Sequence, residues 1–549
     1  MSVVLGVSCH YHDAAAALVV DGQIVAAAQE ERFTRVRFDP SLPEAAMRWC
    51  LGHARISPEQ LDQVVYYENP YARLERLLAW SIRCWPRGWR SFPQIMSSQL
   101  GGKLTVLDRI AATLGVARRK VVHTDHHRAH AASAFFCSPF PRAAVLTLDG
   151  VGEHATTTIS VGEGRSLRRT FALDFPHSLG LLYAAVTALC GFEVNDGEYK
   201  VMGLAAYGRP RHREALDKVL RVHEDATFTL DSRALDDLLD PERGYGAGLV
   251  ALLGEPRPPG PWDLSRPEDQ RYADIAASVQ ALTEDVVLGL ARRARAEAGC
   301  AELCLAGGVA LNCVANARVA AEGPLFVQPA AGDAGAALGA AILGALERGD
   351  PRPPPLERAD LGPRANPGRA ADIARHLGFR VSSVDPSAEA AKRLEAGEIV
   401  AWVQGGCEWG PRALGHRSIL ANPRFNGVKD RVNLAVKGRE IFRPFAPVVR
   451  AEDCARYFEG GPDLLTPFMT TVRRSRTAAQ AVTHIDGTSR VQTVTGGPLK
   501  PLLDAVPMLL NTSLNAAGDP MAAREADALG FFLSQPVDAL LIEDLLVTR

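Results

Sequence analysis

The chain has 549 residues, of which 47% are hydrophobic and 23% are charged, with a formal net charge of -2. This composition is typical of a globular protein with room for at least two domains. The near-neutral charge argues against a general electrostatic attraction to nucleic acid or to an anionic membrane, so we expect neither as a partner. An anionic substrate would have to be bound by local basic clusters.

The cellular location is predicted from the cysteines and from the hydrophobic segments. Ten cysteines are scattered without a CxxC pair, which favours reduced thiols in a cytoplasmic protein. The first residues lack the basic region of a signal peptide, and the alanine-rich run at 334–345 is too short to span a bilayer. We therefore expect a cytoplasmic protein with no membrane segment.

The first elements predict a duplicated α/β domain. Strands are expected at 3–7, 15–20 and 24–28, with a hairpin turn at Asp21-Gly22. The pattern returns with strands at 145–148 and 156–161. Two strand–acidic turn–strand units indicate a duplicated domain with a nucleotide cleft between its halves, as in actin and the sugar kinases.

A candidate metal site lies close to the second copy. His126 and His130 are spaced i, i+4, which places both imidazoles on one face of a helix. Asp149 is expected at the end of a buried strand. Asp333 opens an alanine-rich helix, where it could cap the helix or bind metal, and the two histidines favour the metal. Two imidazoles and two carboxylates predict a site for a divalent transition metal.

A glycine pair follows another expected strand. Gly307 and Gly308 come directly after the hydrophobic run 303–306 and precede a helix. Glycines at such a place let the backbone approach a ligand closely, and a helix N-terminus favours phosphate. A tight turn without a ligand is the alternative.

Residues 71–100 are rich in tryptophan and arginine. This pattern can bind nucleic acid, wall an acceptor pocket, or pack as a helical excursion or dimer contact, and we favour packing. If this segment forms a dimer contact, the protein is a homodimer. The residues are Trp80, Arg83, Trp85, Arg87, Trp89 and Arg90.

The proline-rich stretch 350–355 predicts the domain boundary. The expected domains are 1–355 and 356–549. The second is expected to be α/β, with strands at 399–403, 446–449 and 506–510 and helices at 388–396 and 523–533.

The second domain also contains three basic clusters and a run of short polar residues. Guanidinium groups beside glycine and proline turns can offer paired donors to phosphate oxygens. Together they indicate a site for two anionic, phosphorylated substrates. The segments are 409–418, 436–443, 483–490 and 511–515.

Long motifs throughout the chain resemble one family, the O-carbamoyltransferases of antibiotic and nodulation-factor biosynthesis. The motifs lie at 12–13, 30–35, 126–130, 197–205, 305–312, 410–415 and 511–513. The resemblance implies an N-terminal domain similar to the actin-like (ASKHA) protein of tRNA threonylcarbamoylation. It implies a C-terminal domain similar to the YrdC-like fold of threonylcarbamoyl-adenylate synthases.

The resemblance also implies a reaction in two steps. The second domain would form carbamoyl-adenylate from carbamoyl phosphate and ATP, releasing phosphate and pyrophosphate. The first domain would transfer the carbamoyl group to a hydroxyl of a small-molecule acceptor, such as an antibiotic or its sugar. Enclosed sites suit this intermediate because it is a mixed anhydride that water would destroy.

Site residues and cofactors follow from the same resemblance. The metal would be Fe(II), although the ligand types do not distinguish it from Mn(II) or Zn(II), and Mg would accompany ATP. The metal would orient the adenylate phosphate, and His12 would polarise the carbamoyl group or assist the acceptor hydroxyl, unless it is a buried structural residue. Catalytic roles fall on His12, Arg37, Arg412 and Lys437. Nucleotide-binding roles fall on Glu198, Lys200, Gly307, Gly308, Asn312, Arg439, Arg443, Arg490, Ser513 and Asn515.

The chain departs from the family pattern at two places. Arg37 stands where the family usually has lysine, which keeps the charge but replaces a point donor with a planar fork. Residues 521–524 replace a more usual hydrophobic-Val-Cys-Thr run.

Three other functions remain open. A tRNA threonylcarbamoyl transferase would use the same folds, but the near-neutral charge disfavours it. A sugar kinase would leave the second domain without a role. A nucleotide-gated binding protein would make no use of the His/Asp cluster.

Overall fold

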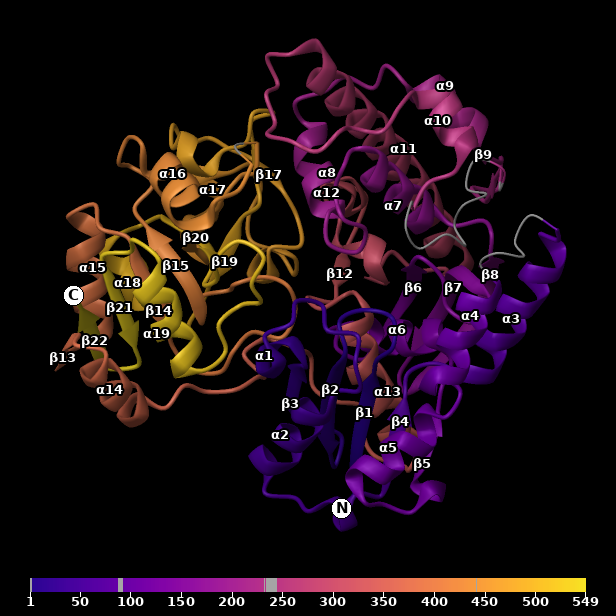
Figure 1. The fold of residues 1–549 in the computed structure, drawn as a ribbon, viewed down its shortest axis with the longest axis horizontal. Helices are drawn as coiled ribbons and strands as arrows, with labels where there is room; N and C mark the ends of the chain where they lie inside the picture. Colours follow the sequence, from indigo (N-terminus) through magenta and orange to yellow (C-terminus); the bar gives the residue numbers. More distant parts are fainter. Residues whose placement is uncertain (1, 87–91, 232, 234–243, 441) are drawn as a thin grey trace. The chain divides into compact units, whose positions relative to one another are not determined.

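The computed structural model describes residues 2–86, 92–231, 233, 244–440 and 442–549. The chain divides into two compact units (Figure 1). The first unit contains residues 1–30 and 40–356, and the second contains residues 31–39 and 357–549. In the described part of the chain, no helix is both long enough and apolar enough to cross a membrane.

The first unit contains two sheets with the same strand order. The order is β3-β2-β1-β4-β5 in one and β8-β7-β6-β11-β12 in the other. In each sheet the first three strands in sequence are antiparallel, and the last two run parallel to the first. This repeat confirms the predicted duplication. The bounds are β1 Val3–Ser8, β2 Ala15–Val20, β3 Gln23–Gln29, β4 Gln63–Tyr66, β5 Val121–His123, β6 Arg142–Leu148, β7 Ala155–Glu163, β8 Ser166–Asp174, β11 Leu303–Ala306 and β12 Leu325–Val327.

Helices α6 (His126–Phe135) and α13 (Asp333–Glu347) form the buried centre of this unit. All but one residue of α6 and the first thirteen residues of α13 are buried. The helices approach closely because Gly339 has no side chain: a Cβ there would lie 1.9 Å from the carbonyl oxygen of Ala129. This contact fixes the helix that carries both histidines against the helix that begins with Asp333.

Other helices surround the two sheets. The longest is α11 (Pro267–Ala298), which packs against the second sheet and against α7, α8, α9 and α12. The bounds of the others are α2 Glu44–Ala54, α3 Pro70–Arg83, α4 Phe92–Ser98, α5 Val106–Leu114, α7 Leu179–Leu189, α8 Glu198–Ala205, α9 Arg213–Val219, α10 Ala247–Leu253 and α12 Cys313–Ala320. A short hairpin, β9 (Leu220–Val222) with β10 (Phe228–Leu230), completes the unit.

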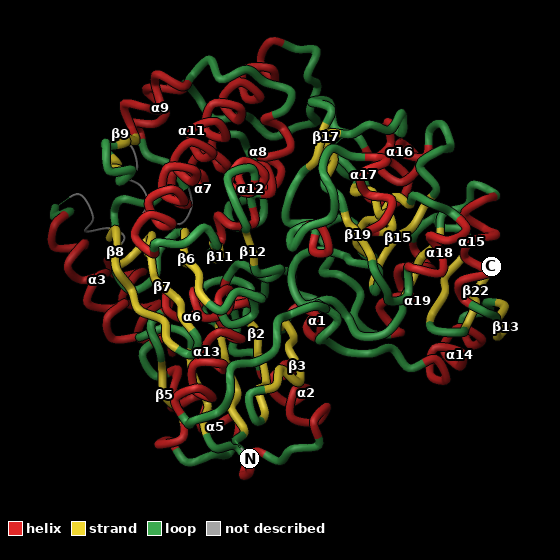
Figure 2. Tube along the Cα trace, turned by 180° about the vertical axis from the view of Figure 1, so that it is seen from behind, coloured by secondary structure: helices red, strands yellow, loops and turns green. Residues whose placement is uncertain are grey.

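The second unit is built on an eight-stranded mixed sheet in the order β13-β22-β21-β14-β15-β20-β16-β19. Helices cover both faces (Figure 2), and alternate residues of β14 enter two different cores: Ala401 and Val403 in one, Val400 and Trp402 in the other. The strands are β13 Arg380–Ser383, β14 Val400–Val403, β15 Arg417–Ala421, β16 Ala446–Arg450, β19 Gln492–Val494, β20 Leu509–Ser513, β21 Ala539–Ile542 and β22 Leu545–Thr548. The helices are α1 Glu31–Thr34, α14 Pro367–His376, α15 Pro386–Glu395, α16 Val428–Asp430, α17 Cys454–Tyr457, α18 Lys500–Ala505 and α19 Glu525–Ser534. A separate two-stranded sheet consists of β17 Arg473–Arg474 and β18 Thr488–Ser489.

One strand differs from the sequence-based expectation. A strand was expected at 506–510, but β20 covers Leu509–Ser513 because α18 continues to Ala505. The polar residues 511–513 therefore lie inside the strand. Asn511 is accommodated there because its amide donates to the carbonyl of Ala413 and to the side chain of Gln492.

Candidate active sites

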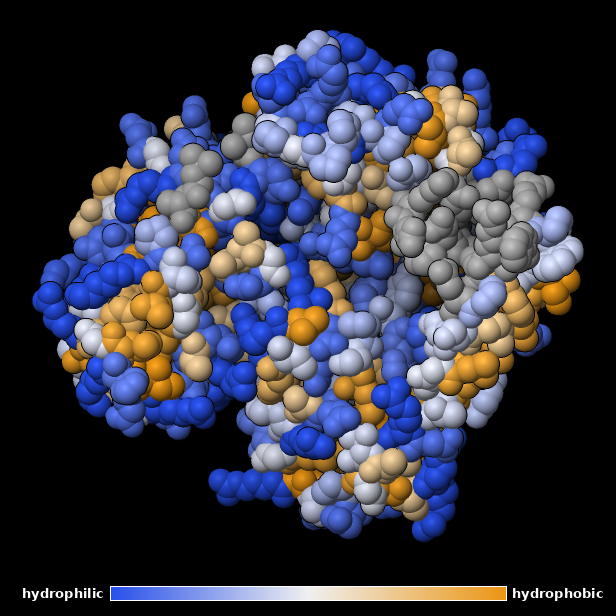
Figure 3. All heavy atoms as spheres, in the orientation of Figure 1, coloured by the Kyte–Doolittle hydropathy of each residue, from blue (hydrophilic) through white to orange (hydrophobic). Residues whose placement is uncertain are grey.

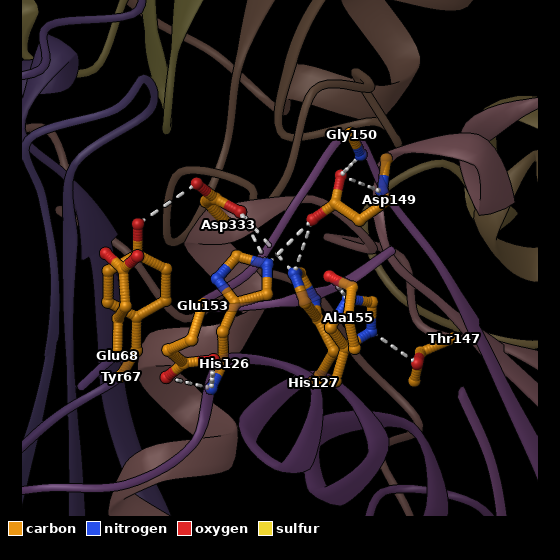
Figure 4. A network of polar contacts seen from close by, with 12 residues as sticks. Tyr67, Glu68, His126, His127, Thr147, Asp149, Gly150, Glu153, Ala155 and Asp333 are labelled. Carbon is orange, nitrogen blue, oxygen red and sulfur yellow. Dashed lines mark hydrogen bonds and ion pairs between the residues drawn. The ribbon is translucent and has the colours of Figure 1, made fainter. Parts of the chain in front are cut away.

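The two predicted histidines face one carboxylate. Helix α6 begins at His126, where Asp125 caps the helix by accepting from the Arg128 amide and Glu153 accepts from the His126 amide. Nε2 of His126 lies 2.9 Å from Asp149 Oδ2, and Nε2 of His130 lies 3.0 Å from the same oxygen (Figure 4). The i, i+4 spacing has therefore brought both imidazoles to one point.

Two backbone amides, one just after β6 and one just after β11, hold this carboxylate in place. Asp149 Oδ1 accepts from the amides of Gly150 and Gly308, at 2.8 and 3.2 Å. Gly307 has φ +90°, and a Cβ there would lie 2.2 Å from the Leu148 carbonyl oxygen. Sequence analysis expected the pair Gly307-Gly308 to approach a ligand; in the structure Gly307 approaches the end of β6.

Asp333 completes the cluster. Its Oδ1 lies 3.4 Å from His130 Nε2 and 3.9 Å from His126 Nε2, and its Oδ2 accepts from the Tyr67 hydroxyl at 3.2 Å. The N-cap position of α13 is Gly332, with no side-chain cap. The sequence left Asp333 two roles, helix cap and metal ligand, and the geometry favours the metal ligand.

The chemistry of the four donors fits a divalent ion. One atom from each side chain lies within 4.8 Å of the others. Ligands at about 2.1 Å from one ion are about 3.0 Å apart at a right angle and about 3.4 Å apart at a tetrahedral angle. The observed nitrogen–oxygen separations of 2.9–3.9 Å are close to these values. Such a set suits iron, manganese or zinc.

Charge interactions keep the carboxylates ionised. Burial opposes ionisation of Asp149, but hydrogen bonds from both imidazoles hold its pKa well below the usual range. The pKa of Asp333 is also lowered against the effect of burial, chiefly by His130 and then by His12. Both groups are therefore ready to bind a cation at neutral pH.

His127 lies beside the cluster but does not join it. Its Nδ1 contacts the Thr147 hydroxyl at 2.7 Å and its Nε2 contacts the Ala155 carbonyl at 2.9 Å. Both ring nitrogens are thus engaged by the second sheet, and His127 has a structural role.

Two of the predicted nucleotide-binding residues of the first unit, Glu198 and Lys200, lie on α8. Glu198 begins α8, where burial raises its pKa although its side chain accepts a hydrogen bond from the Asn195 amide at 2.9 Å. Lys200 lies 5.5 Å from the ring centroid of Phe192.

Asn312 is held by a residue that the sequence analysis missed. Its amide nitrogen donates to Gln280 Oε1 at 2.9 Å, and its own oxygen accepts from Gln280 and from the Ala315 amide. Tyr183 donates to the same Gln280 oxygen. No motif marked Gln280, because it lies on the buried face of α11 far away in sequence.

The predicted Lys437, Ser513 and Asn515 come together in the second unit. Lys437 Nζ donates to the carbonyls of Ser513 and Asn515 at 2.9 and 2.8 Å, and to Asn515 Oδ1 at 2.6 Å. Burial, followed by the charges of Arg439, Arg443 and Arg37, holds the pKa of Lys437 well below its usual value. This lysine lies in a strongly cationic environment that an anionic ligand would relieve.

The other predicted cations occupy loops of the same unit. Arg439 donates to Asn433 Oδ1 at 2.8 Å, and its guanidinium lies 4.2 Å from the Phe445 ring centroid. Arg443 pairs with Glu440 at 3.4 Å, and Arg490 is half-buried just after β18.

Arg412 is buried on a loop that Glu408 organises. One oxygen of Glu408, Oε1, accepts from the amides of Leu414, His416 and Arg417 at 2.8–3.0 Å. Sequence analysis missed Glu408, which precedes the glycine–proline turn by two residues.

The tryptophan- and arginine-rich segment is only partly packed. Trp80 contacts Phe175 edge-on, with centroids 4.7 Å apart, whereas Ile82 and Trp85 are 76% and 70% exposed. Hydrophobic side chains gather where Figure 1 draws α3 and α4 (Figure 3). Arg87, Trp89 and Arg90 lie outside the described residues. A cavity of about 370 Å³ beside the start of α3 is lined by Ala72, Glu153, His154 and Asp174 among others.

Sequence comparison identifies the family. Residues 3–342 match the carbamoyltransferase N-terminus, and residues 391–549 match the carbamoyltransferase C-terminus. The chain therefore belongs to the carbamoyltransferase family and is a transferase enzyme.

Two named relatives are similar to the chain, and one of them is named as an O-carbamoyltransferase. The chain is 36% identical to nodulation protein NolNO of Sinorhizobium fredii, over 98% of this chain and 79% of that protein. It is 28% identical to a 3'-hydroxymethylcephem-O-carbamoyltransferase of Amycolatopsis lactamdurans, over 97% of each.

Solved structures resemble the chain more weakly. HypF of T. kodakarensis is 16% identical, with a TM-score of 0.33 over 63% of this chain and 48% of that chain. A ROK hexokinase of Thermus thermophilus is 14% identical, with a TM-score of 0.30 over 63% of this chain and 99% of that chain.

Proposed function

We propose that the chain is an ATP-dependent O-carbamoyltransferase with one reaction site in each unit. The observation that carries this proposal is the pair of polar clusters: a His₂Asp₂ set in the first unit and the buried Lys437 with its surrounding cations in the second. In this proposal the first unit corresponds to an actin-like transfer domain and the second to a YrdC-like domain. The boundary between the two domains would lie near residue 355. The protein would be cytoplasmic.

The second unit would make the activated carbamoyl group. One carbamoyl phosphate, one ATP and one water give carbamoyl-adenylate, phosphate and pyrophosphate. Lys437 and Arg412 would be the catalytic cations, joined by Arg37. Arg439, Arg443, Arg490, Ser513 and Asn515 would bind the phosphates and the nucleotide, with Mg accompanying ATP.

The first unit would transfer the carbamoyl group. The acceptor hydroxyl oxygen attacks the carbamoyl carbon, the bond to the adenylate phosphate breaks, and AMP leaves. His12 would accept the hydroxyl proton, and Glu198, Lys200, Asn312 and the glycine pair would hold the nucleotide. A divalent ion held by the His₂Asp₂ set, with iron the expected metal, would supply a Lewis acid for phosphate.

The acceptor would be a hydroxylated small molecule, such as an antibiotic or its sugar. Purified protein is given ATP, carbamoyl phosphate and a panel of hydroxylated natural products, and products are analysed by mass spectrometry. Addition of one carbamoyl group, together with AMP and pyrophosphate release, is the expected result. Phosphorylated products, or ATP binding without turnover, would contradict the proposal.

The His12→Asn substitution separates the two steps. We expect it to abolish carbamoyl transfer, because the proton acceptor is lost, while carbamoyl-phosphate-dependent pyrophosphate release continues in the second unit. Loss of both reactions would rule out the role assigned to His12.

A further inference from the structure

A short N-terminal segment, residues 31–39, belongs to the second unit, although the residues on both sides of it belong to the first. We call this segment the strap; it begins with α1 (Figure 1). Glu30, the residue before it, is anchored in the first unit by accepting from the amides of Ala45 and Ala46. The change of unit therefore takes place between two consecutive residues.

Arg32 of the strap holds the loop that carries Arg412. Arg32 is 3% exposed, and its Nη2 donates to the Gly410 carbonyl at 2.9 Å. Its Nη1 pairs with Glu31 at 2.5 Å. Gly410 lies two residues before Arg412, so this hydrogen bond fixes one end of the turn whose other end is held by Glu408.

Arg35 holds the loop that follows β20. Its two terminal nitrogens donate to the carbonyls of Pro520 and Met521, each at 2.7 Å. The amide of Ala522 donates to the Leu514 carbonyl and closes the loop. Ser513, the last residue of β20, and Asn515, on this loop, both accept hydrogen bonds from Lys437.

The strap also supplies a charge and has a defined shape of its own. Arg37 is one of the three cations that hold down the pKa of Lys437. Glu31 accepts from the Phe38 amide at 2.9 Å, and Arg35 and Phe38 have φ +62° and +50°. Left-handed backbone at two non-glycine residues persists only where surrounding contacts enforce it.

We propose that Arg32 and Arg35 are positioning residues for the adenylate-forming reaction, with the strap fixing the Arg412 and Ser513–Asn515 loops around Lys437. This inference rests on the function proposed above. It assigns the two arginines a role in loop geometry, with no contact to substrate. It also predicts that residues 357–549 alone do not contain a complete site.

The test uses full-length Arg32→Lys and Arg35→Lys variants, which keep the charge and most of the side-chain length. A lysine cannot reproduce the paired geometry of a guanidinium, so Arg35→Lys can engage only one of the two carbonyls well. Arg375→Ala serves as the control, because Arg375 is an exposed arginine of α14 in the same unit. Hydrogen exchange by mass spectrometry and carbamoyl-phosphate-dependent pyrophosphate release are measured for each protein.

We expect faster hydrogen exchange confined to 410–417 in Arg32→Lys and to 513–524 in Arg35→Lys. Pyrophosphate release should fall by about 100-fold in Arg35→Lys, because a misplacement of about 1 Å has that effect on catalysis. The control should match the wild type. Wild-type exchange in both loops, or faster exchange throughout the second unit, would overturn the proposal, since the arginines would then be dispensable or merely structural.

The two proposals can fail separately. If the wild type releases no pyrophosphate but the exchange changes are local, the reaction assignment is wrong while the strap still positions these loops. If the wild type is active and Arg35→Lys keeps full activity, the positioning role is wrong while the function stands.

Discussion

Replacing Asp149 with asparagine is the most direct test of the metal cluster. One oxygen of Asp149 faces both histidines and the other is held by two backbone amides. An asparagine side chain at this position would have nearly the same shape but would lack the negative charge. The substitution therefore removes one of four ligands with little change in packing.

The size of the effect follows from the number of ligands. A structural zinc site with four ligands has an apparent binding free energy of about 10–16 kcal/mol, which is about 2.5–4 kcal/mol for each ligand. Since about 1.4 kcal/mol corresponds to a factor of ten, loss of one ligand should weaken binding by about 100-fold or more.

The assay measures metal affinity by competition with a chelator, and metal content after dialysis by elemental analysis. Iron, manganese and zinc are compared for the wild type and for Asp149→Asn. Asp125→Asn is the matched control, because Asp125 caps the same helix and asparagine caps as well as aspartate. If Asp149→Asn binds each metal within about threefold of the wild type, against the expected loss of about 100-fold, the cluster is not the metal site.

Two further predictions concern Lys437 and the glycine pair. Because burial and neighbouring cations lower the pKa of Lys437, a phosphate ligand should raise that pKa again and cause uptake of a proton. Affinity for carbamoyl phosphate should then fall as pH rises; calorimetry in buffers of different ionisation enthalpy checks this, and an enthalpy independent of the buffer would refute it. Gly307→Ala should destabilise the first unit by about 3 kcal/mol or more, because its Cβ would meet the Leu148 carbonyl. Gly349→Ala, with φ +102° but open space, should cost only about 1–2 kcal/mol, so equal melting temperatures for the two variants would contradict the close-contact argument.

Periodicity and turn residues were sufficient to predict most local structure. The strand expected at 15–20 matches β2, and the alanine-rich helix expected after Asp333 matches α13. Local signals work here because burial of one strand or one helix face requires apolar residues at fixed spacing. The strand at 506–510 was misplaced because polar residues 511–513 belong to the strand, where the Asn511 side chain finds partners in the Ala413 carbonyl and in Gln492 of β19.

The i, i+4 spacing of His126 and His130 also determined half of the metal cluster. A helix fixes the relation between those two side chains whatever surrounds them. The family resemblance also predicted that Lys437, Ser513 and Asn515 belong to one site. In the structure Lys437 donates hydrogen bonds to both of the other residues.

Only the tertiary structure decided the geometry in which distant residues meet. It gave Asp333 a place facing the histidines rather than a helix cap, because packing of α13 against α6 sets the direction of its first residue. It also assigned residues 31–39 to the second unit, where Arg32 and Arg35 bind backbone carbonyls. The motif at 30–35 marked these arginines, but any residue has a backbone carbonyl, so the sequence did not show which loops they would contact.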